Sequence, residues 1–201
     1  MLSGSRREVE SKMNIEINVP DGKSGEWEVS TFTVSNDDAK LFNLREMMHR
    51  SCRTIYPGTY KKLTRNNYII MSNTPAEIRD HIHFIHLASG SVLINGLGLG
   101  VAFSAILKKD TVSNVTIIEK SKDVIDLVAP TYLQDKRVEI INEDAFEFKP
   151  PKNKKYDFVW HDIWDDICAD NLSEMIKLHR KYARKTSWQD SWCRWECKRR
   201  K

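Results

Sequence analysis

The chain has 201 residues, a formal net charge of +4, and a composition that is 40% hydrophobic and 30% charged. This balance is typical of one folded domain with an appendage, and it excludes a disordered chain. No apolar run approaches the roughly 20 residues that span a bilayer, and the first residues lack the apolar core of a signal peptide, so we expect a cytoplasmic protein without a membrane partner.

The four cysteines do not form a recognisable metal or disulfide pattern. In a reducing compartment we expect free thiols at Cys52, Cys168, Cys193 and Cys197. A structural zinc site needs about four ligands, and no second pair accompanies the last two, so no metal is predicted. The basic end CKRRK reads as a solvated tail, and we do not expect nucleic acid as a partner.

The first third of the chain predicts a small α+β unit. Residues 1–12 read as a flexible lead, and residues 13–74 form the unit. The alternation in NIEINV and WEVSTFTV predicts a β-hairpin whose loop is longer than two residues. Ser35 then caps a helix over 37–50. The apolar stripe expected on that helix consists of Ala39, Leu41, Phe42, Leu44 and Met48.

A second hairpin and a well-marked helix follow. Asn66 and Asn67 tolerate left-handed backbone and separate two strand-like runs. Thr74 as cap, Pro75 at the first helical position and Glu77 as the capping-box carboxylate predict a helix to about residue 89. Its three histidines do not form a ligand set, and we interpret them as ordinary surface or partly packed residues.

Residues 75–201 predict an α/β domain with a doubly wound, mostly parallel Rossmann-like sheet. From residue 91 on, apolar strands alternate with helices, which is typical of a parallel sheet covered on both faces. The expected strands are SVLIN, VTIIE, VEIINED and YDFVWHD. A last helix is expected over 171–185. Trp188, Trp192 and Trp195 recur at helical spacing, which favours packing on the sheet or on a partner subunit over an aromatic substrate wall.

In such a sheet, ligands bind beyond the carboxyl ends of the strands, so the loops there carry the candidate site. Gly96, Gly98 and Gly100 follow the first strand and let backbone approach a ligand closely. Taken alone, this loop could be only a tight turn. Glu119 ends the second strand, at the distance where a carboxylate can accept both ribose hydroxyl protons.

The third and fourth strands also end in acidic residues. Asp144 can accept from an adenine amino group, with Ala145 beside it, or it can serve as a loop or helix-cap residue. Asp162 and Asp165 can hold a cation or take a proton from a nucleophile. Capping of the next helix is the alternative role for these two aspartates.

In their order, NGLGLG, VTIIEK, INEDAFEF and YDFVWHDIWDD resemble the successive motifs of class I S-adenosylmethionine (SAM)-dependent methyltransferases, closest to the spermidine synthase-like branch. The resemblance covers roughly residues 91–166. It implies SAM as cofactor and Asp162 and Asp165 as catalytic residues. The cofactor-binding residues it implies are Asn95, Gly96, Leu97, Gly98, Gly100, Glu119, Lys120, Asp144, Ala145 and Asp162.

Two departures from that branch shape the expected function. Spermidine synthases carry an aspartate in the glycine loop that helps bind the amine, and this chain has Leu99 there; the residues after Asp166 are also too few for the usual C-terminal hairpin. We therefore expect a transferase that moves a methyl, or less readily an aminopropyl, group to a small-molecule acceptor. The alternative is a non-catalytic SAM-binding or scaffold protein.

Other cofactor classes fit the motifs less well. A dinucleotide-binding fingerprint needs a third glycine where Val101 stands, and the fourth-strand motif lacks the Pro-Pro-aromatic sequence of enzymes that methylate flipped bases. The acceptor and the oligomeric state are left open by the sequence. A homo-oligomer is one arrangement that would cover an exposed sheet edge.

Overall fold

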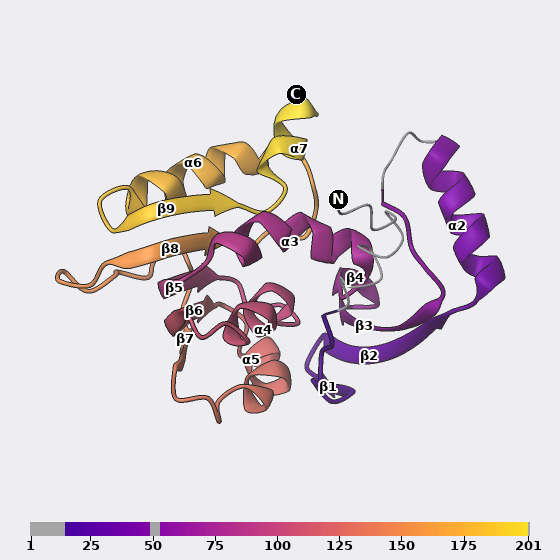
Figure 1. The fold of residues 1–201 in the computed structure, drawn as a ribbon, viewed down its shortest axis with the longest axis horizontal. Coiled ribbons are helices and arrows are strands. Elements are labelled where there is room, and N and C mark those ends of the chain that lie inside the picture. The colour runs from indigo at the N-terminus through magenta and orange to yellow at the C-terminus, as the bar shows by residue number, and fades with distance from the viewer. Residues whose placement is uncertain (1–14, 49–52, 201) are drawn as a thin grey trace, which may run out of the picture.

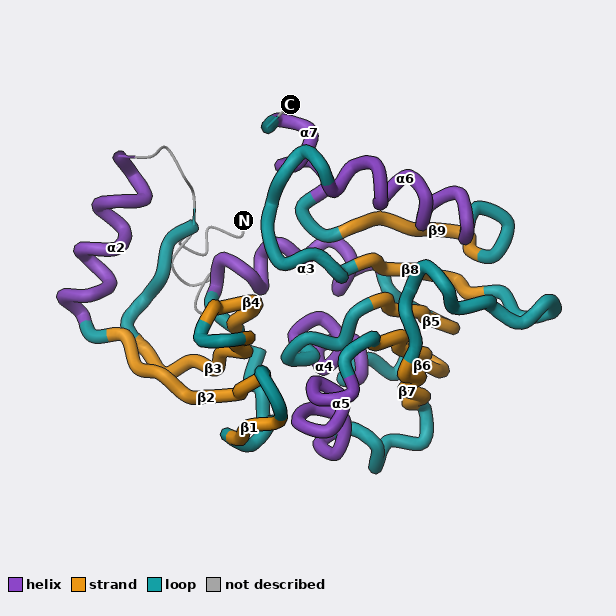
Figure 2. Tube along the Cα trace, turned by 180° about the vertical axis from the view of Figure 1, so that it is seen from behind, coloured by secondary structure: helices purple, strands orange, loops and turns teal. Residues whose placement is uncertain are grey.

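The computed structural model describes residues 15–48 and 53–200 and contains two sheets that lie side by side (Figure 1; Figure 2). One sheet is antiparallel, with strand order β1-β2-β3-β4, and the other is parallel, with order β7-β6-β5-β8-β9. The expected flexible lead at residues 1–12 and Cys52 lie outside the described residues. The prediction of an α/β fold with a separate β-rich N-terminal unit is confirmed.

The antiparallel sheet forms from two hairpins, and the first differs from the prediction. Its strands are β1 (Gly22–Ser24), β2 (Trp27–Val34), β3 (Gly58–Arg65) and β4 (Tyr68–Ser72). The first hairpin has a two-residue turn in which Gly25 has φ +54°, and its first strand lies in the predicted loop. Ile17 and Val19 are buried without joining the sheet. Their alternation therefore indicated burial but not strand pairing.

The second hairpin is confirmed. β3 and β4 are joined by Asn66 and Asn67, whose φ values are +50° and +67°. Two consecutive residues with positive φ are the mark of a turn whose twist matches that of the flanking strands, and asparagine adopts this backbone more readily than other non-glycine residues.

Helix α2 (Asn36–Met48) is present, but its apolar residues do not form one packed stripe. The Ser35 hydroxyl accepts from the backbone N–H of Asp38, as expected of the cap. Of the predicted stripe, only Ala39 is buried, and the others are exposed. At about 100° per residue, Leu41, Leu44 and Met48 lie on the side of the helix opposite Ala39. Leu41 and Phe42 line an open cavity together with Phe32 and Ile69 of the antiparallel sheet.

Helix α3 (Pro75–Leu87) starts where the capping signals predict, with different hydrogen bonds. The side chain of Thr74 does not cap the helix; the Glu77 carboxylate accepts from the backbone N–H and the hydroxyl of Ser72 instead, at 2.9 and 3.2 Å. Glu77 thus ties the helix to the end of β4. Because α3 contacts both units, the division of the chain between residues 74 and 75 stays a prediction.

The parallel sheet contains the four predicted strands and one more. Its strands are β5 (Gly90–Asn95), β6 (Val112–Glu119), β7 (Val138–Asn142), β8 (Tyr156–His161) and β9 (Thr186–Ser191). The helices between them are α4 (Val101–Leu107), α5 (Lys122–Val128) with the 3-10 turn η1 (Ala129–Thr131), and α6 (Asn171–Tyr182). From β5 the chain adds β6 and then β7 on one side of β5, and it then returns to add β8 and β9 on the other side. The order in which strands are added therefore reverses between β5 and β8.

The tryptophans of the C-terminal segment do not form the helical stripe that their spacing predicted. Trp188 lies on β9, and only Trp195 lies on a helix, α7 (Arg194–Arg199), where it is 67% exposed. The three tryptophans therefore do not share a helix face. The helical spacing was misleading, because residues 186–191 pair with β8 as a parallel edge strand. The predicted packing is nevertheless found for Trp192, which lies in the apolar core, and for Trp188, which packs against it.

Each face of the parallel sheet has its own apolar core. Val92 and Ile94 pack with α3, α4 and α5 on one face, whereas Leu93 packs with α6 on the other, as strand alternation requires. At the α3 side, Phe84 stacks on Trp160 with ring centroids 5.0 Å apart and an interplanar angle of 5°. This pair fixes α3 over β8.

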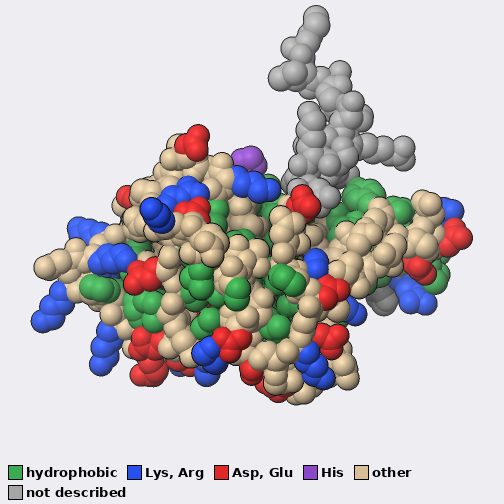
Figure 3. All heavy atoms as spheres, turned by 90° about the horizontal axis from the view of Figure 1, so that it is seen from below, with side chains coloured by type: hydrophobic (Ala, Val, Ile, Leu, Met, Phe, Trp, Pro, Cys, Tyr) green, Lys and Arg blue, Asp and Glu red, His purple; other side chains and the backbone are tan. Residues whose placement is uncertain are grey.

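The molecular surface mixes charges of both signs on the face seen in Figure 3, where basic and acidic side chains surround scattered apolar atoms. Within the described residues, no helix is long and apolar enough to cross a membrane.

Truncation of the aromatic stack tests how much α3 packing contributes to stability. Phe84 is fully buried, so Phe84→Ala should lower the free energy of unfolding by about 3–5 kcal/mol through lost burial and a cavity. Leu87→Ala on the same helix, where the side chain is 41% exposed, is the control and should change little. Equal losses in urea unfolding would contradict this packing.

Candidate functional site

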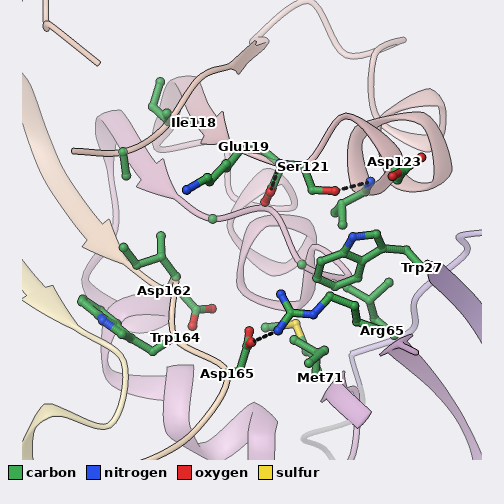
Figure 4. Close-up of a pocket in the computed structure, with 18 of the residues that line it drawn as sticks. Trp27, Arg65, Met71, Ile118, Glu119, Ser121, Asp123, Asp162, Trp164 and Asp165 are labelled. Carbon is green, nitrogen blue, oxygen red and sulfur yellow. Dashed lines mark hydrogen bonds and ion pairs between the residues drawn. The ribbon is translucent and has the colours of Figure 1, made fainter. Parts of the chain in front are cut away.

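A cavity of about 550 Å³ lies at the carboxyl ends of β5, β6 and β8, between the two sheets (Figure 4). Trp27, Arg65 and Met71 reach it from the antiparallel sheet, and Glu119 and Asp162 reach it from the parallel sheet. The antiparallel sheet therefore forms a roof over the edge where a doubly wound fold binds its ligands.

The glycine loop after β5 is shaped by close contacts. Gly96 has φ +97°, and a Cβ atom there would lie 1.9 Å from the carbonyl oxygen of Asp162. A Cβ atom on Gly98, at φ +49°, would lie 2.7 Å from the sulfur of Met71, which is the flexible end of a side chain. The requirement for glycine is thus strictest at Gly96. Both glycines line the cavity.

Three of the predicted loop residues do not line the cavity. Leu97 is buried in the core, and Gly100 starts α4. The Asn95 side chain lies in the interior, where its amide nitrogen is 2.7 Å from His161 Nδ1 and its oxygen accepts from Tyr182 at 3.4 Å. Cofactor binding by these three residues stays a prediction. Because they do not line the cavity, they would act on a cofactor by shaping the backbone of the loop.

Glu119 lies at the centre of the site. Its carboxylate accepts from the backbone N–H groups of Leu97 at 2.8 Å and Ser121 at 2.7 Å, so it links the glycine loop to the loop after β6. Burial raises the pKa of this carboxyl group, and these amide donors oppose the shift. The backbone N–H groups of Lys120 and Gly98 act on the carboxylate in the same direction.

Lys120, Asp144 and Ala145 lie together on the next part of the rim. The Lys120 ammonium is 2.8 Å from Asp144 Oδ2, and this hydrogen bond lowers the pKa of the Asp144 carboxyl. The other oxygen of Asp144 accepts from the Phe146 N–H at 2.8 Å. Asp144 thus also has the loop-cap role that the sequence left open.

Asp162 lies at the floor of the cavity with its side chain 10% exposed. Burial raises the pKa of its carboxyl well above the usual range, and the nearby carboxylates of Glu77, Asp80 and Glu119 raise it further. Asp80 is itself paired with Arg53 at 2.8 Å. The floor of the cavity is therefore a site where a negative charge is costly.

Asp165, the second predicted catalytic residue, forms an ion pair across the cavity with Arg65 at 2.6 Å. The Arg65 guanidinium also lies over the Trp27 ring, 5.2 Å from its centroid. Figure 4 shows Arg65 between Trp27 and Asp165, so this ion pair connects the roof to the loop after β8. It does not cap α6, which excludes the alternative role for Asp165.

The interpretation of the histidines was wrong for His81. Its side chain is fully buried, and its Nε2 is 3.8 Å from Asp162 Oδ2, whereas His83 and His86 are exposed. The sequence did contain a signal. Glu77, Asp80 and His81 have the three- and four-residue spacing of one helix face, directly before the first strand of the parallel sheet. Trp27 and Arg65 had no such local signal.

The cavity lining is rich in carboxylates. Its acidic residues are Glu26, Glu77, Glu119, Asp123, Asp144, Asp162, Asp165 and Glu174, and its basic residues are Arg65, Lys120 and Lys122. Among the described residues, no group of three or more His, Cys, Asp or Glu side chains is arranged to hold a metal ion. The lining suits a polar ligand with hydroxyl donors and a positive charge.

The strand order and the cavity define a doubly wound α/β protein with a cavity at its topological switch point, where such folds bind their ligands. The sequence model of the spermine/spermidine synthase domain matches residues 78–186, which is more than half of the chain. The chain belongs to this family.

Similarity to individual proteins is more limited. A polyamine aminopropyltransferase of Lachnospira eligens is 30% identical over 117 residues, which cover 53% of this chain and 41% of that protein. The N-methyltransferase NodS of Bradyrhizobium japonicum aligns at 11% identity and TM-score 0.44, covering 54% of this chain and 61% of that one. The CcbJ methyltransferase of Streptomyces caelestis aligns at 16% identity and TM-score 0.43, covering 54% of this chain and 44% of that one.

Glu77 gives the site a testable pH dependence. Burial raises the pKa of its carboxyl from 4.5 to about 7, so the folded state holds a proton that the unfolded chain releases earlier. This contribution to stability is complete below about pH 4.5 and is lost as the pH rises through about 7.

Glu77→Gln should remove this dependence. Relative to the variant, the wild-type free energy of unfolding should fall by up to about 3 kcal/mol between these pH values, measured by urea denaturation at each pH. The exposed Glu147→Gln is the control. A constant difference between wild type and Glu77→Gln would show that the Glu77 carboxyl is not perturbed.

Proposed function

We propose that this protein is a transferase that binds SAM, or its decarboxylated form, in the cavity and transfers a methyl or aminopropyl group to a small-molecule acceptor. The observation that carries the proposal is the position of Glu119. Its carboxylate faces the cavity while its amide contacts hold the glycine loop in place. Membership of the spermine/spermidine synthase family supports the same class of cofactor.

The residues present fit an adenosyl cofactor. A cavity of about 550 Å³ lies within the range of roughly 300–1,000 Å³ that holds small organic ligands. Glu119 would accept from the ribose hydroxyls, and Asp144, with Ala145 beside it, would lie toward the adenine. At Gly96 any side chain would collide with the Asp162 backbone, which keeps the path along the loop open to a ligand.

The bound cofactor would supply a sulfonium whose attached carbon is open to nucleophilic attack. The protein would hold the acceptor in line with that carbon and remove the proton that the acceptor releases. Asp162 is the residue at the cavity floor that would take this proton, and Asp165 would orient the acceptor through the Arg65 ion pair.

The acceptor side differs from that of a polyamine site. Leu99 stands where spermidine synthases carry the loop aspartate, and it is fully buried. Arg65 moreover places a positive charge beside Asp165, where a second ammonium group would be repelled. These two features favour an acceptor with a single nucleophilic nitrogen or oxygen over a polyamine.

Replacement of Glu119 tests the cofactor site. Glu119→Gln removes the negative charge and should weaken SAM binding by roughly 1.5–3 kcal/mol, about 10- to 150-fold in Kd by calorimetry. Glu139→Gln, an exposed glutamate on β7, is the control. If the wild-type chain binds neither SAM, its decarboxylated form nor its demethylated product, the proposal is wrong.

Transfer distinguishes an enzyme from a non-catalytic SAM-binding protein. Wild-type chain incubated with SAM labelled in the methyl group, or with decarboxylated SAM labelled in the aminopropyl group, should label an acceptor in a panel of small amines, carboxylates and phenols. Asp162→Asn should abolish labelling, and the exposed Asp166→Asn should label as wild type does. Tight binding without transfer to any acceptor would support the non-catalytic alternative.

A further inference from the structure

His81 is buried in a way that its packing does not explain. The side chain is completely buried on α3, and neither ring nitrogen has a hydrogen-bond partner among the described residues. A buried polar nitrogen without a partner destabilises the fold, and such groups are rare in folded proteins. An apolar side chain would fill the same space without this cost, so packing alone does not explain why a histidine lies here.

The nearest acidic group to His81 is the Asp162 carboxyl. Nε2 lies 3.8 Å from Oδ2, just beyond hydrogen-bond distance, and the Asp162 side chain is only 10% exposed. The imidazole also lies against the Trp160 ring, with centroids 6.0 Å apart and an interplanar angle of 72°. An approach of about 1 Å by the carboxyl group would complete a hydrogen bond, and such bonds commonly tighten when a site is filled.

The surroundings disfavour an isolated charge on either group. Asp162 is buried and faces the carboxylates of Glu77 and Asp80 on α3 and Glu119 on β6, which raise its pKa. His81 is buried and faces Arg53, which together lower its pKa to about 4. These shifts favour the neutral form of each group taken alone, whereas the two together can exchange a proton without changing the net charge of the site.

We propose that His81 and Asp162 share one titratable proton, which makes His81 a positioning residue that sets the orientation and charge of the carboxyl group at the cavity floor. At rest the proton lies on Oδ2 and is directed toward the lone pair of Nε2. When it moves to Nε2, the O–H bond breaks, an N–H bond forms, and the products are a carboxylate and an imidazolium.

This pairing deepens the proposed function and rests on it for its catalytic meaning. An anionic Asp162 is needed to accept a proton from the acceptor, yet burial raises the pKa of this group and so favours its protonated form. Transfer to His81 supplies the carboxylate inside the closed site, without a proton passing to solvent. A positively charged ligand beside Asp162 would favour the charged form of the pair.

Nuclear magnetic resonance of the ligand-free protein tests the pairing directly. In chain labelled with ¹⁵N-histidine and ¹³C-aspartate, the His81 ring nitrogens and the Asp162 carboxyl carbon should report one common midpoint in a pH titration. At neutral pH, Asp162→Ala should shift the Nε2 resonance of His81 more than the Nδ1 resonance. His83, exposed on the same helix, should be unaffected.

The reciprocal variant removes the nitrogens and keeps a ring. His81→Phe should move the midpoint of the Asp162 carboxyl, and the control His83→Phe should not. Independent midpoints in wild type, or a His81 spectrum unchanged by Asp162→Ala, would overturn the pairing. Because no ligand is added, a chain that fails to bind SAM would contradict the proposed function and not this result.

Discussion

The site depends on the close approach of Gly96 to the backbone of Asp162. The space for a Cβ atom on Gly96 is already taken by the Asp162 carbonyl oxygen, and the Gly96 N–H donates to the carbonyl of Ile118 at the end of β6. The Asp162 N–H in turn donates to the Asn95 carbonyl. Three strand ends are thereby joined by backbone contacts, and these contacts fix where the side chains of Glu119 and Asp162 can lie.

The carboxylates that line the cavity repel one another, and nearby cations and backbone amides offset this repulsion at several of them. Lys120 neutralises Asp144, Arg65 neutralises Asp165, and backbone amides solvate Glu119. Asp162 has none of these partners, and burial favours its protonated form. Of these four carboxyl groups, Asp162 is therefore the one without a cationic or amide partner among the described residues.

The sequence was sufficient for the features that depend on local pattern. The four strands of the parallel sheet, the Asn66 turn and the loop acids could be predicted because periodicity, turn chemistry and strand ends are local properties. The first hairpin, the tryptophans and His81 could not, since their roles depend on which distant segment lies alongside. Trp188 has helical spacing with Trp192 and Trp195 but lies on a strand that pairs with β8. His81 lies 3.8 Å from Asp162, a residue that is distant in the sequence.

The Arg65–Asp165 ion pair joins residues 100 positions apart, and the hydrogen bond from Ser24 to Asp123 spans 99. Closing loops of this length costs chain entropy before any contact repays it, so contacts of this kind form late in folding. During synthesis from the N-terminus, the antiparallel sheet is complete well before the loop after β8 that carries Asp162 and Asp165. The cavity thus depends on contacts between segments far apart in the chain, and a partly folded chain that retains both sheets without these contacts would lack the cavity.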